Sequence, residues 1–82
     1  MSQAAQIYHA AFQKPRTPRS EPYKRGVRAA LERLIDGGPE ISRVRPAEYQ
    51  PGTVEFDAWL AGVEEGHMRA RHYLQRQTST AQ

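Results

Sequence analysis

The side chains best suited to acid–base or metal chemistry are three histidines, His9, His67 and His72, and the adjacent pair Glu64 and Glu65. His67 and His72 are five positions apart, so a helix does not place them on one face as it places metal ligands that are four residues apart. His67 also falls among apolar residues at helical spacing, which favours a histidine packed at the edge of a core. Neighbouring glutamates favour a solvated acidic face rather than a general acid with its base. These residues therefore predict no catalytic site and no metal site.

Motifs of phosphate-binding and nucleophilic enzymes are also missing from the sequence. The stretch DGGPE, residues 36–40, lacks the spacing of a phosphate-binding loop and the Lys–Ser/Thr that follows one. Ser20, Ser42 and Thr53 show no spacing to a histidine and an aspartate that would indicate a catalytic triad. The absence of cysteine excludes disulfides and thiolate metal sites. Because a chain of 82 residues has a marginal core with which to hold a catalytic geometry, we expect no enzyme, no metal and no cofactor.

The chemistry that the sequence does favour is the binding of a polyanion. Residues 1–36 carry seven basic and three acidic side chains, a net charge of +4, whereas residues 53–82 carry three basic and four acidic ones, a net charge of −1. A basic surface attracts phosphates, although ordinary solvation would explain the overall charge of +3 equally well. The predicted nucleic-acid contacts are six cations and two tyrosines that could stack on bases: Lys14, Arg16, Arg19, Tyr23, Lys24, Arg25, Arg28 and Tyr49.

Residues 1–20 are predicted to form a short helix followed by a basic arm. The stretch AAQIYHAAF places apolar residues at helical spacing and predicts a helix over about residues 3–13, with Ser2 as its N-cap. A helix this short rarely persists alone in water, so its apolar side chains need a partner surface. The following KPRTPRSEP contains three prolines and predicts an extended linker that carries the first three of these cations.

Two longer helices are predicted over about residues 21–36 and 54–76, which gives an all-α fold built as a small two-helix hairpin. The first has Ser20 as its N-cap, and Gly37 can end it in the left-handed conformation. The second has Thr53 as its N-cap and acidic residues in its first turn, where the helix dipole favours them. Apolar residues recur in both at spacings of three and four, which predicts one buried stripe on each helix.

The connection between these helices is rich in proline and is predicted to be irregular. Its segment ISRVR, residues 41–45, predicts an extended loop that packs Ile41 or Val44 against the helices. The helical domain then spans residues 21–77. Residues 78–82 contain no apolar side chain larger than alanine, so we expect a frayed tail.

Three glycines fall inside the predicted helices, where each costs about 1 kcal/mol relative to alanine. Gly26 lies in the first helix, and Gly62 and Gly66 lie four residues apart in the second. Alanines accompany them in both helices. This pattern predicts that the two backbones approach closely in an antiparallel or crossed pair, with Trp59 packed beside the small residues.

Two stretches, YKRGVRAAL at residues 23–31 and EYQPGTVEFDAWLAGVEEG at residues 48–66, resemble the ribosome modulation factor family. That family has an Arg-Gly-x-x-Ala-Gly/Ala helix, a loop with Pro-Tyr that often continues as Pro-Gly-Thr/Ser, and a second helix with Ala/Gln-Trp-x-x-Gly-Trp. Glu48 and Val63 stand where the family has proline and a second tryptophan. The matching positions are Arg25-Gly26 with Ala29-Ala30, Tyr49 with Pro51-Gly52-Thr53, and Trp59-Leu60 with Gly62.

The resemblance implies a ribosome-associated, RNA-binding factor of the hibernation type, which acts by stoichiometric binding. Its implied partner is ribosomal RNA in the small subunit, near the messenger-exit region, and its implied effect is the formation of inactive ribosome dimers. The absence of cysteine from so small a chain favours the cytoplasm. No apolar run approaches the roughly 18 residues of a membrane span, so we expect no membrane association.

The same fold is carried by small plasmid and phage proteins, so the residues leave a second function open. In this alternative the chain is a phage or mobile-element protein that binds and inhibits a protein partner through its helical surface. The N-terminal helix would then supply the contact, or join two copies in a homodimer, through Ile7, Tyr8 and Phe12. A steep salt dependence of binding would favour RNA, whereas affinity carried by those apolar residues would favour a protein.

Overall fold

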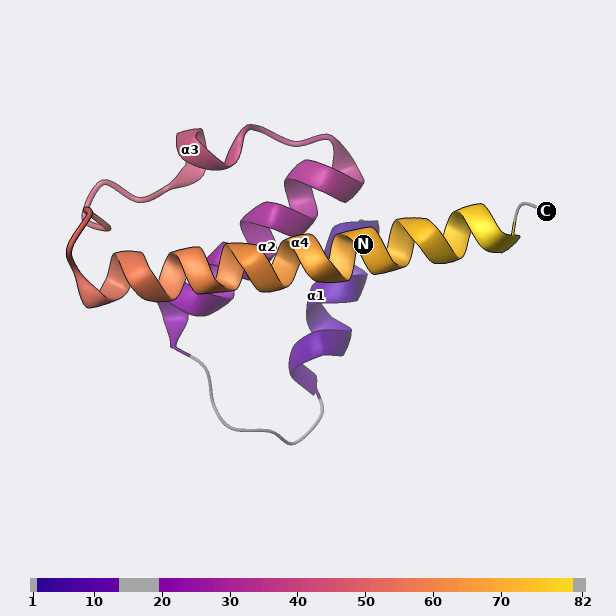
Figure 1. The fold of residues 1–82 in the computed structure, drawn as a ribbon, viewed down its shortest axis with the longest axis horizontal. Coiled ribbons are helices and arrows are strands. Elements are labelled where there is room, and N and C mark those ends of the chain that lie inside the picture. The colour runs from indigo at the N-terminus through magenta and orange to yellow at the C-terminus, as the bar shows by residue number, and fades with distance from the viewer. Residues whose placement is uncertain (1, 14–19, 81–82) are drawn as a thin grey trace.

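The computed structural model describes residues 2–13 and 20–80, and within them every regular element is a helix, which confirms the predicted all-α class. The described chain has four helices, more than the predicted hairpin with its short N-terminal helix. They are α1 (Gln3–Gln13), α2 (Glu21–Asp36), α3 (Ile41–Val44) and α4 (Val54–Thr80) (Figure 1).

The three longer helices begin at the side-chain caps that the sequence predicts. Each cap satisfies a backbone N–H that the first turn of a helix leaves without a partner. Gly37 follows α2 with φ 72°, in the left-handed region that favours glycine. The capping hydroxyl oxygens accept from the N–H three residues further on: Ser2 from Ala5 (3.0 Å), Ser20 from Tyr23 (3.4 Å) and Thr53 from Phe56 (3.1 Å).

The extended loop predicted for residues 41–45 is wrong, because the chain forms the single helical turn α3 there. Ile41 and Val44 are three residues apart, a spacing that suits one side of a turn. The N–H of Arg43 donates to the carbonyl of Glu40 at 2.9 Å and closes the turn.

The predicted end of the last helix at Arg76 is also wrong, because α4 continues to Thr80. Its final residues therefore belong to the stretch that was expected to be a frayed tail, residues 78–82. Residues 77–80 contain neither glycine nor proline, the residues that most strongly stop a helix, so nothing local ends it earlier.

The backbones of α2 and α4 meet where the helices cross, as the glycines predict. A Cβ atom placed on Gly26 would stand 2.8 Å from the backbone nitrogen of Val63 and closer still to the carbonyl oxygen of Trp59. A Cβ atom on Gly62 would stand 2.9 Å from the carbonyl carbon of Tyr23 and closer still to its oxygen. Carbon atoms do not pack at such distances, so only glycine fits at both positions.

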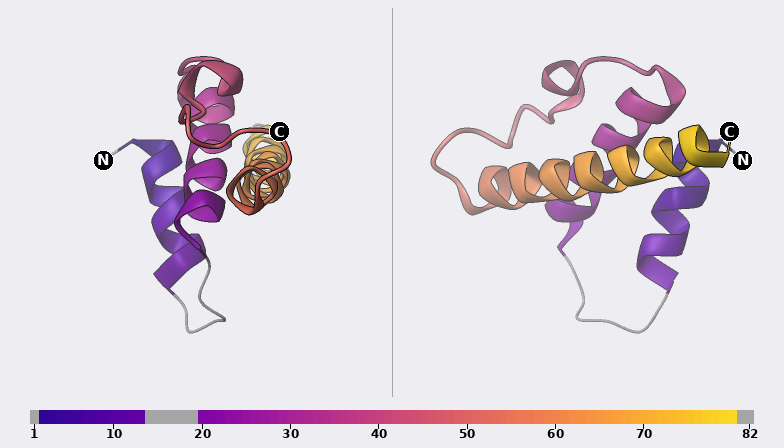
Figure 2. Two further views of the ribbon diagram at one scale, coloured as in Figure 1. Left: turned by 90° about the vertical axis from the view of Figure 1, so that its left-hand side faces the viewer. Right: turned by 45° about the vertical axis from the view of Figure 1, so that its right-hand side comes forward.

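The third glycine extends the same contact along α4. A Cβ atom on Gly66 would stand 2.6 Å from the Cβ of Ala30 and from the carbonyl oxygen of Val27. The pair is crossed, the second of the two predicted arrangements, and both helices run toward the same side of the molecule (Figures 1 and 2).

The core consists of two clusters of buried side chains on either side of this crossing. The first joins α1, α2 and α4, and the half-buried Ile7, Tyr8 and Phe12 of α1 pack against it. The second joins α2 and α4 to the connection that precedes α4. Their buried members are Ala4, Val27, Leu31 and Ala70 in the first, and Ala30, Tyr49, Trp59 and Val63 in the second.

The connection between α2 and α4 is long because the two helices run in the same direction. Because both helices run the same way, residues 37–53 must return from the end of α2 to the start of α4 (Figures 1 and 2). Tyr49, 5% exposed, and the half-buried Ile41 pack this return path onto the second cluster. The connection is thereby held beside α2.

The crossing predicts that Gly62→Ala destabilises the fold although alanine is the better helix former. The propensity gain is about 1 kcal/mol, but the new methyl group must displace the backbone at Tyr23. We expect a net loss of about 1–3 kcal/mol in the free energy of unfolding, measured by urea denaturation. The control is Ala61→Gly at the adjacent exposed position, which should lose about 1 kcal/mol. A Gly62→Ala variant more stable than the parent would contradict the close crossing.

Trp59, 3% exposed, is predicted to anchor the second cluster. Truncation of a buried tryptophan to alanine costs about 3–5 kcal/mol, a large share of the roughly 5–15 kcal/mol that stabilises a folded protein. We expect Trp59→Ala to lose most of its helical circular dichroism and Trp59→Phe to keep it. A Trp59→Ala variant that melts at the parent's temperature would show that Trp59 is not an anchor.

Candidate nucleic-acid interface

The solvent-facing side of α2 carries three of the predicted cations, Lys24, Arg25 and Arg28. Lys24 Nζ lies 3.4 Å from Glu21 Oε1, and Arg28 Nε donates to Glu32 Oε2 at 3.1 Å. Both ion pairs join neighbours on the surface of one helix, where such pairs contribute little to stability. These cations can therefore exchange a carboxylate for a phosphate at a small cost to the fold.

Arg25 is oriented by Tyr49 rather than by a carboxylate. Its Nη1 donates to the Tyr49 hydroxyl at 3.3 Å. The Tyr49 ring is 5% exposed and packs with Trp59 and Val63. A ring so deeply buried offers no face on which a base could stack, so the predicted stacking role of Tyr49 is wrong. The sequence shows an aromatic residue in a loop, but the return path of the connection places it in the core.

Two further arginines, Arg43 and Arg45, join the α2 cations, although sequence reasoning did not select them. Both are exposed, and neither forms an ion pair with a carboxylate in the part of the chain that the structure describes. The Arg45 guanidinium lies 5.3 Å from the centroid of the Phe56 ring, within the range of a cation–π contact. Residues 37–52 hold two basic and two acidic side chains, so their net charge gave no signal.

Two of the α2 cations, Arg25 and Arg28, line a cavity of about 280 Å³ between α2 and the connection. Its lining combines Arg25 and Arg28 of α2 with Val44 and Pro46 of the connection, and Arg43 and Arg45 flank Val44 in the chain. We call this cavity, with the two arginines that line it and the two that flank Val44, the basic cleft. The other residues that line it are Ala29, Glu32 and Trp59.

The charge of the basic cleft is positive, because Glu32 is the one carboxylate among the residues that line it. That carboxylate already accepts from Arg28. Val44, Pro46 and the edge of Trp59 add apolar surface to the cavity. The arrangement suits a ligand that has an anionic part and an apolar ring or sugar.

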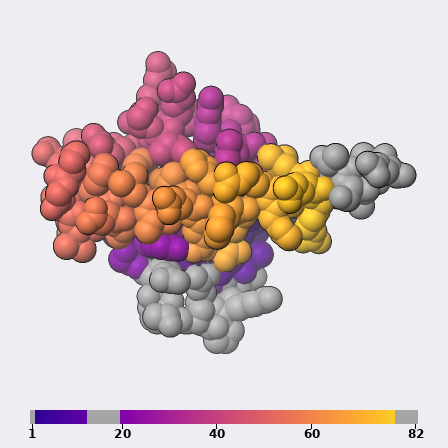
Figure 3. All heavy atoms as spheres, in the orientation of Figure 1, coloured from indigo at the N-terminus to yellow at the C-terminus, as the bar shows by residue number. Residues whose placement is uncertain are grey.

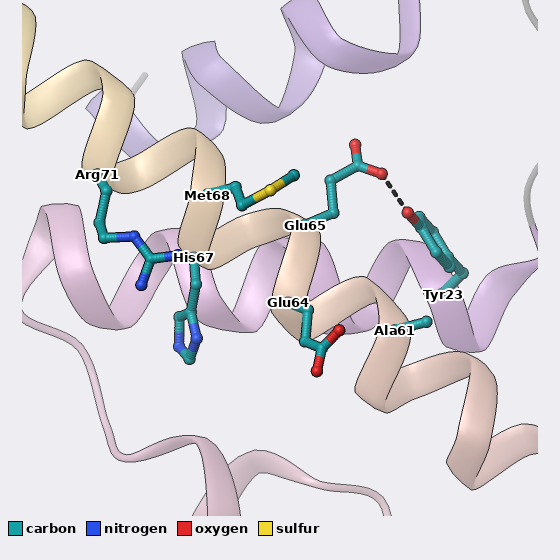
Figure 4. Close-up of a pocket in the computed structure, with 7 residues that line it drawn as sticks. All are labelled: Tyr23, Ala61, Glu64, Glu65, His67, Met68 and Arg71. Carbon is teal, nitrogen blue, oxygen red and sulfur yellow. Dashed lines mark hydrogen bonds between the residues drawn. The ribbon is translucent and has the colours of Figure 1, made fainter.

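Tyr23, the other predicted stacking residue, does not reach the basic cleft. It borders a different cavity of about 550 Å³ along α4, and its hydroxyl donates to the carboxylate of Glu65 (Figure 4). The same glutamate accepts from Arg69 Nε at 2.7 Å. Glu64 lines this cavity too, and two carboxylates disfavour a phosphate there. The structure therefore places Tyr23 in a cavity apart from the basic cleft.

The remaining predicted contacts lie elsewhere. Lys14, Arg16 and Arg19 are outside the described residues. The residues of the protein-binding alternative, Ile7, Tyr8 and Phe12, are half-buried where α1 packs on the first core cluster. Part of their apolar surface is thus already used within the chain.

Comparisons with known proteins add no relative, since no protein-family model, curated protein or solved structure matches the chain. Within residues 2–13 and 20–80, no group of three or more histidine, cysteine, aspartate or glutamate side chains could hold a metal ion. In the same residues no helix is long and apolar enough to cross a membrane. The basic cleft is the feature from which a function can be proposed.

The contact between Arg25 and Tyr49 predicts the effect of Tyr49→Phe. The ring stays in the core, but the guanidinium loses the hydroxyl that accepts its hydrogen bond. We expect the free energy of unfolding to fall by about 1 kcal/mol, measured by urea denaturation. In an Arg25→Gln background the same change should cost clearly less, because the two groups interact. Equal costs in both backgrounds would show that the hydrogen bond is not formed.

Proposed function

We propose that this protein binds RNA in a stoichiometric complex and that the basic cleft is its contact surface. The observation that carries the proposal is a cavity lined by two arginines and one carboxylate, with two more arginines next to its lining residue Val44 in the chain. Arginine presents a planar fork of donors that matches the oxygens of a phosphate. Arg25 and Arg28 stand on a helix anchored in the core, so their spacing is set before the ligand arrives.

The dimensions of the basic cleft favour a single strand over a duplex. Its volume of about 280 Å³ is at the small end of ligand pockets, which span roughly 300–1,000 Å³. A cavity of this size takes one nucleotide unit, with the arginines on the phosphates to either side. Val44 and Pro46 can then contact the sugar or base. Sequence-specific RNA recognition commonly uses such unpaired nucleotides in loops and ends.

The resemblance of residues 23–31 and 48–66 to the ribosome modulation factor family supports a particular RNA. In this proposal the target is ribosomal RNA of the small subunit, and binding holds ribosomes in an inactive, hibernating state. Arg25 belongs to both arguments, because it lies in the matching Arg-Gly pair and in the basic cleft. No chemical step is required, since occupancy alone blocks the ribosome.

The test removes one arginine from each of the two segments, both without a carboxylate partner in the described part of the chain, in the variant Arg25→Gln/Arg43→Gln. Binding to small ribosomal subunits and to a single-stranded RNA is measured across a salt series. Each lost phosphate contact lowers the slope of log K against log salt by about 0.7 for a single strand. We therefore expect a slope lower by about 1.4, and weaker binding at every salt concentration.

The matched control is Arg69→Gln/Arg76→Gln, which removes the same charge from α4. We expect this control to keep the parent's slope. The thermal unfolding of both variants shows that each is folded before binding is compared. Equal affinity and slope for the cleft variant and the parent would contradict the RNA proposal, and binding to a protein in place of RNA would support the alternative function.

A further inference from the structure

The outward face of α4 carries apolar side chains that are partly exposed to solvent. α4 lies across the front of the molecule along its whole described length (Figure 3). Met68 is 60% exposed, and Leu60 and Leu74 are 42% and 43% exposed. Exposed apolar residues along one helix face mark a surface on which another helix could pack.

The charged residues on this face are opposite in sign on the two sides of its midpoint, with an acidic residue before it and a basic residue after it. Glu64 and Arg71 are two helical turns apart, on either side of a midpoint near residues 67 and 68. Both are exposed and project to the same side of α4 (Figure 4). Neither forms an ion pair in the described part of the chain. Rotation by 180° about the midpoint places the glutamate where the arginine was.

We propose that the occupant of this face is a second copy of the chain, with the two α4 helices packed antiparallel about a twofold axis through the midpoint. Glu64 of each copy then faces Arg71 of the other, which makes two identical ion pairs. Met68 packs on its own counterpart at the axis, and Leu60 comes beside Leu74 of the other copy. A twofold dimer uses the same surface on both subunits, so that surface must be complementary to itself, as this one is.

Two physical terms favour this occupant over an unrelated partner. The antiparallel arrangement places the acidic first half of each α4, with Glu55, Asp57 and Glu64, beside the half that carries Arg71 of the other copy. It also opposes the two helix dipoles. The dimer does not depend on RNA binding, since α4 contributes to the basic cleft only through Trp59 on its buried side, and the cleft stays accessible when the outward face of α4 is covered.

The test is a charge exchange in the full chain, followed by sedimentation equilibrium over a concentration series. In the Glu64→Arg variant, the new arginine of each copy faces Arg71 of the other copy. In the Arg71→Glu variant, the new glutamate of each copy faces Glu64 of the other copy. We expect each single variant to dimerise about tenfold more weakly than the parent, because like charges meet. The double variant Glu64→Arg/Arg71→Glu and an equimolar mixture of the two single variants restore opposite charges, so both should dimerise as the parent does.

The control is Glu48→Arg, which makes the same charge change in the connection and should leave dimerisation unchanged. Both exchanged positions are exposed, so thermal unfolding should show folded variants. A parent that stays monomeric throughout the series would overturn the proposal. Single variants that dimerise like the parent would overturn it too, as would a mixture of them that stays as weak as each alone.

Discussion

The close approach of the α2 and α4 backbones is the constraint on which the rest of this structure depends. Gly26 and Gly62 leave no room for a Cβ atom at the crossing, so the helices are held by backbone contact as well as by side chains. The two helices run in the same direction, and the chain must therefore return along the pair before α4 can start. That return places α3 and the Pro46 segment beside α2. The basic cleft is thus a consequence of how two helices cross.

Features with a local cause could be predicted from the sequence. Ser20 and Gly37 bound α2 because capping depends on a few neighbouring atoms. The crossing was predictable because a glycine inside a helix has a cost that only close packing explains. Only part of the cleft could be predicted. Arg25 lies in a segment with an excess of basic residues, which the sequence shows directly. The position of Arg43 depends on the return path of the connection, which the sequence does not show.

The same dependence on tertiary structure explains the errors. Tyr49 looks like an exposed aromatic residue in a polar loop, and its burial follows from the packing of that loop on Trp59. The turn at α3 is too short to be stable alone and forms where the loop meets α2. Leu74 continues the spacing of three and four that predicts the buried stripe of the last helix, but it is 43% exposed because α4 extends beyond its crossing with α2.

The two surfaces of the molecule have different electrostatic characters. The basic cleft gathers cations around one paired carboxylate, which suits a polyanion and makes binding sensitive to salt. The outer face of α4 carries one negative side chain, Glu64, and one positive side chain, Arg71. This face is therefore complementary to the same face of a second copy of the chain. Because α4 contributes to the cleft only through the buried Trp59, one chain can use both surfaces at once, and a dimer would present two clefts to its target.

RNA binding at the basic cleft is the central claim, and an amide chemical-shift titration of the full chain with a short single-stranded RNA tests it most directly. The account predicts saturable shifts concentrated at residues 24–29 and 43–46, with residues 64–75 little changed. Shifts confined to the outer face of α4, or an absence of shifts at low salt, would contradict it.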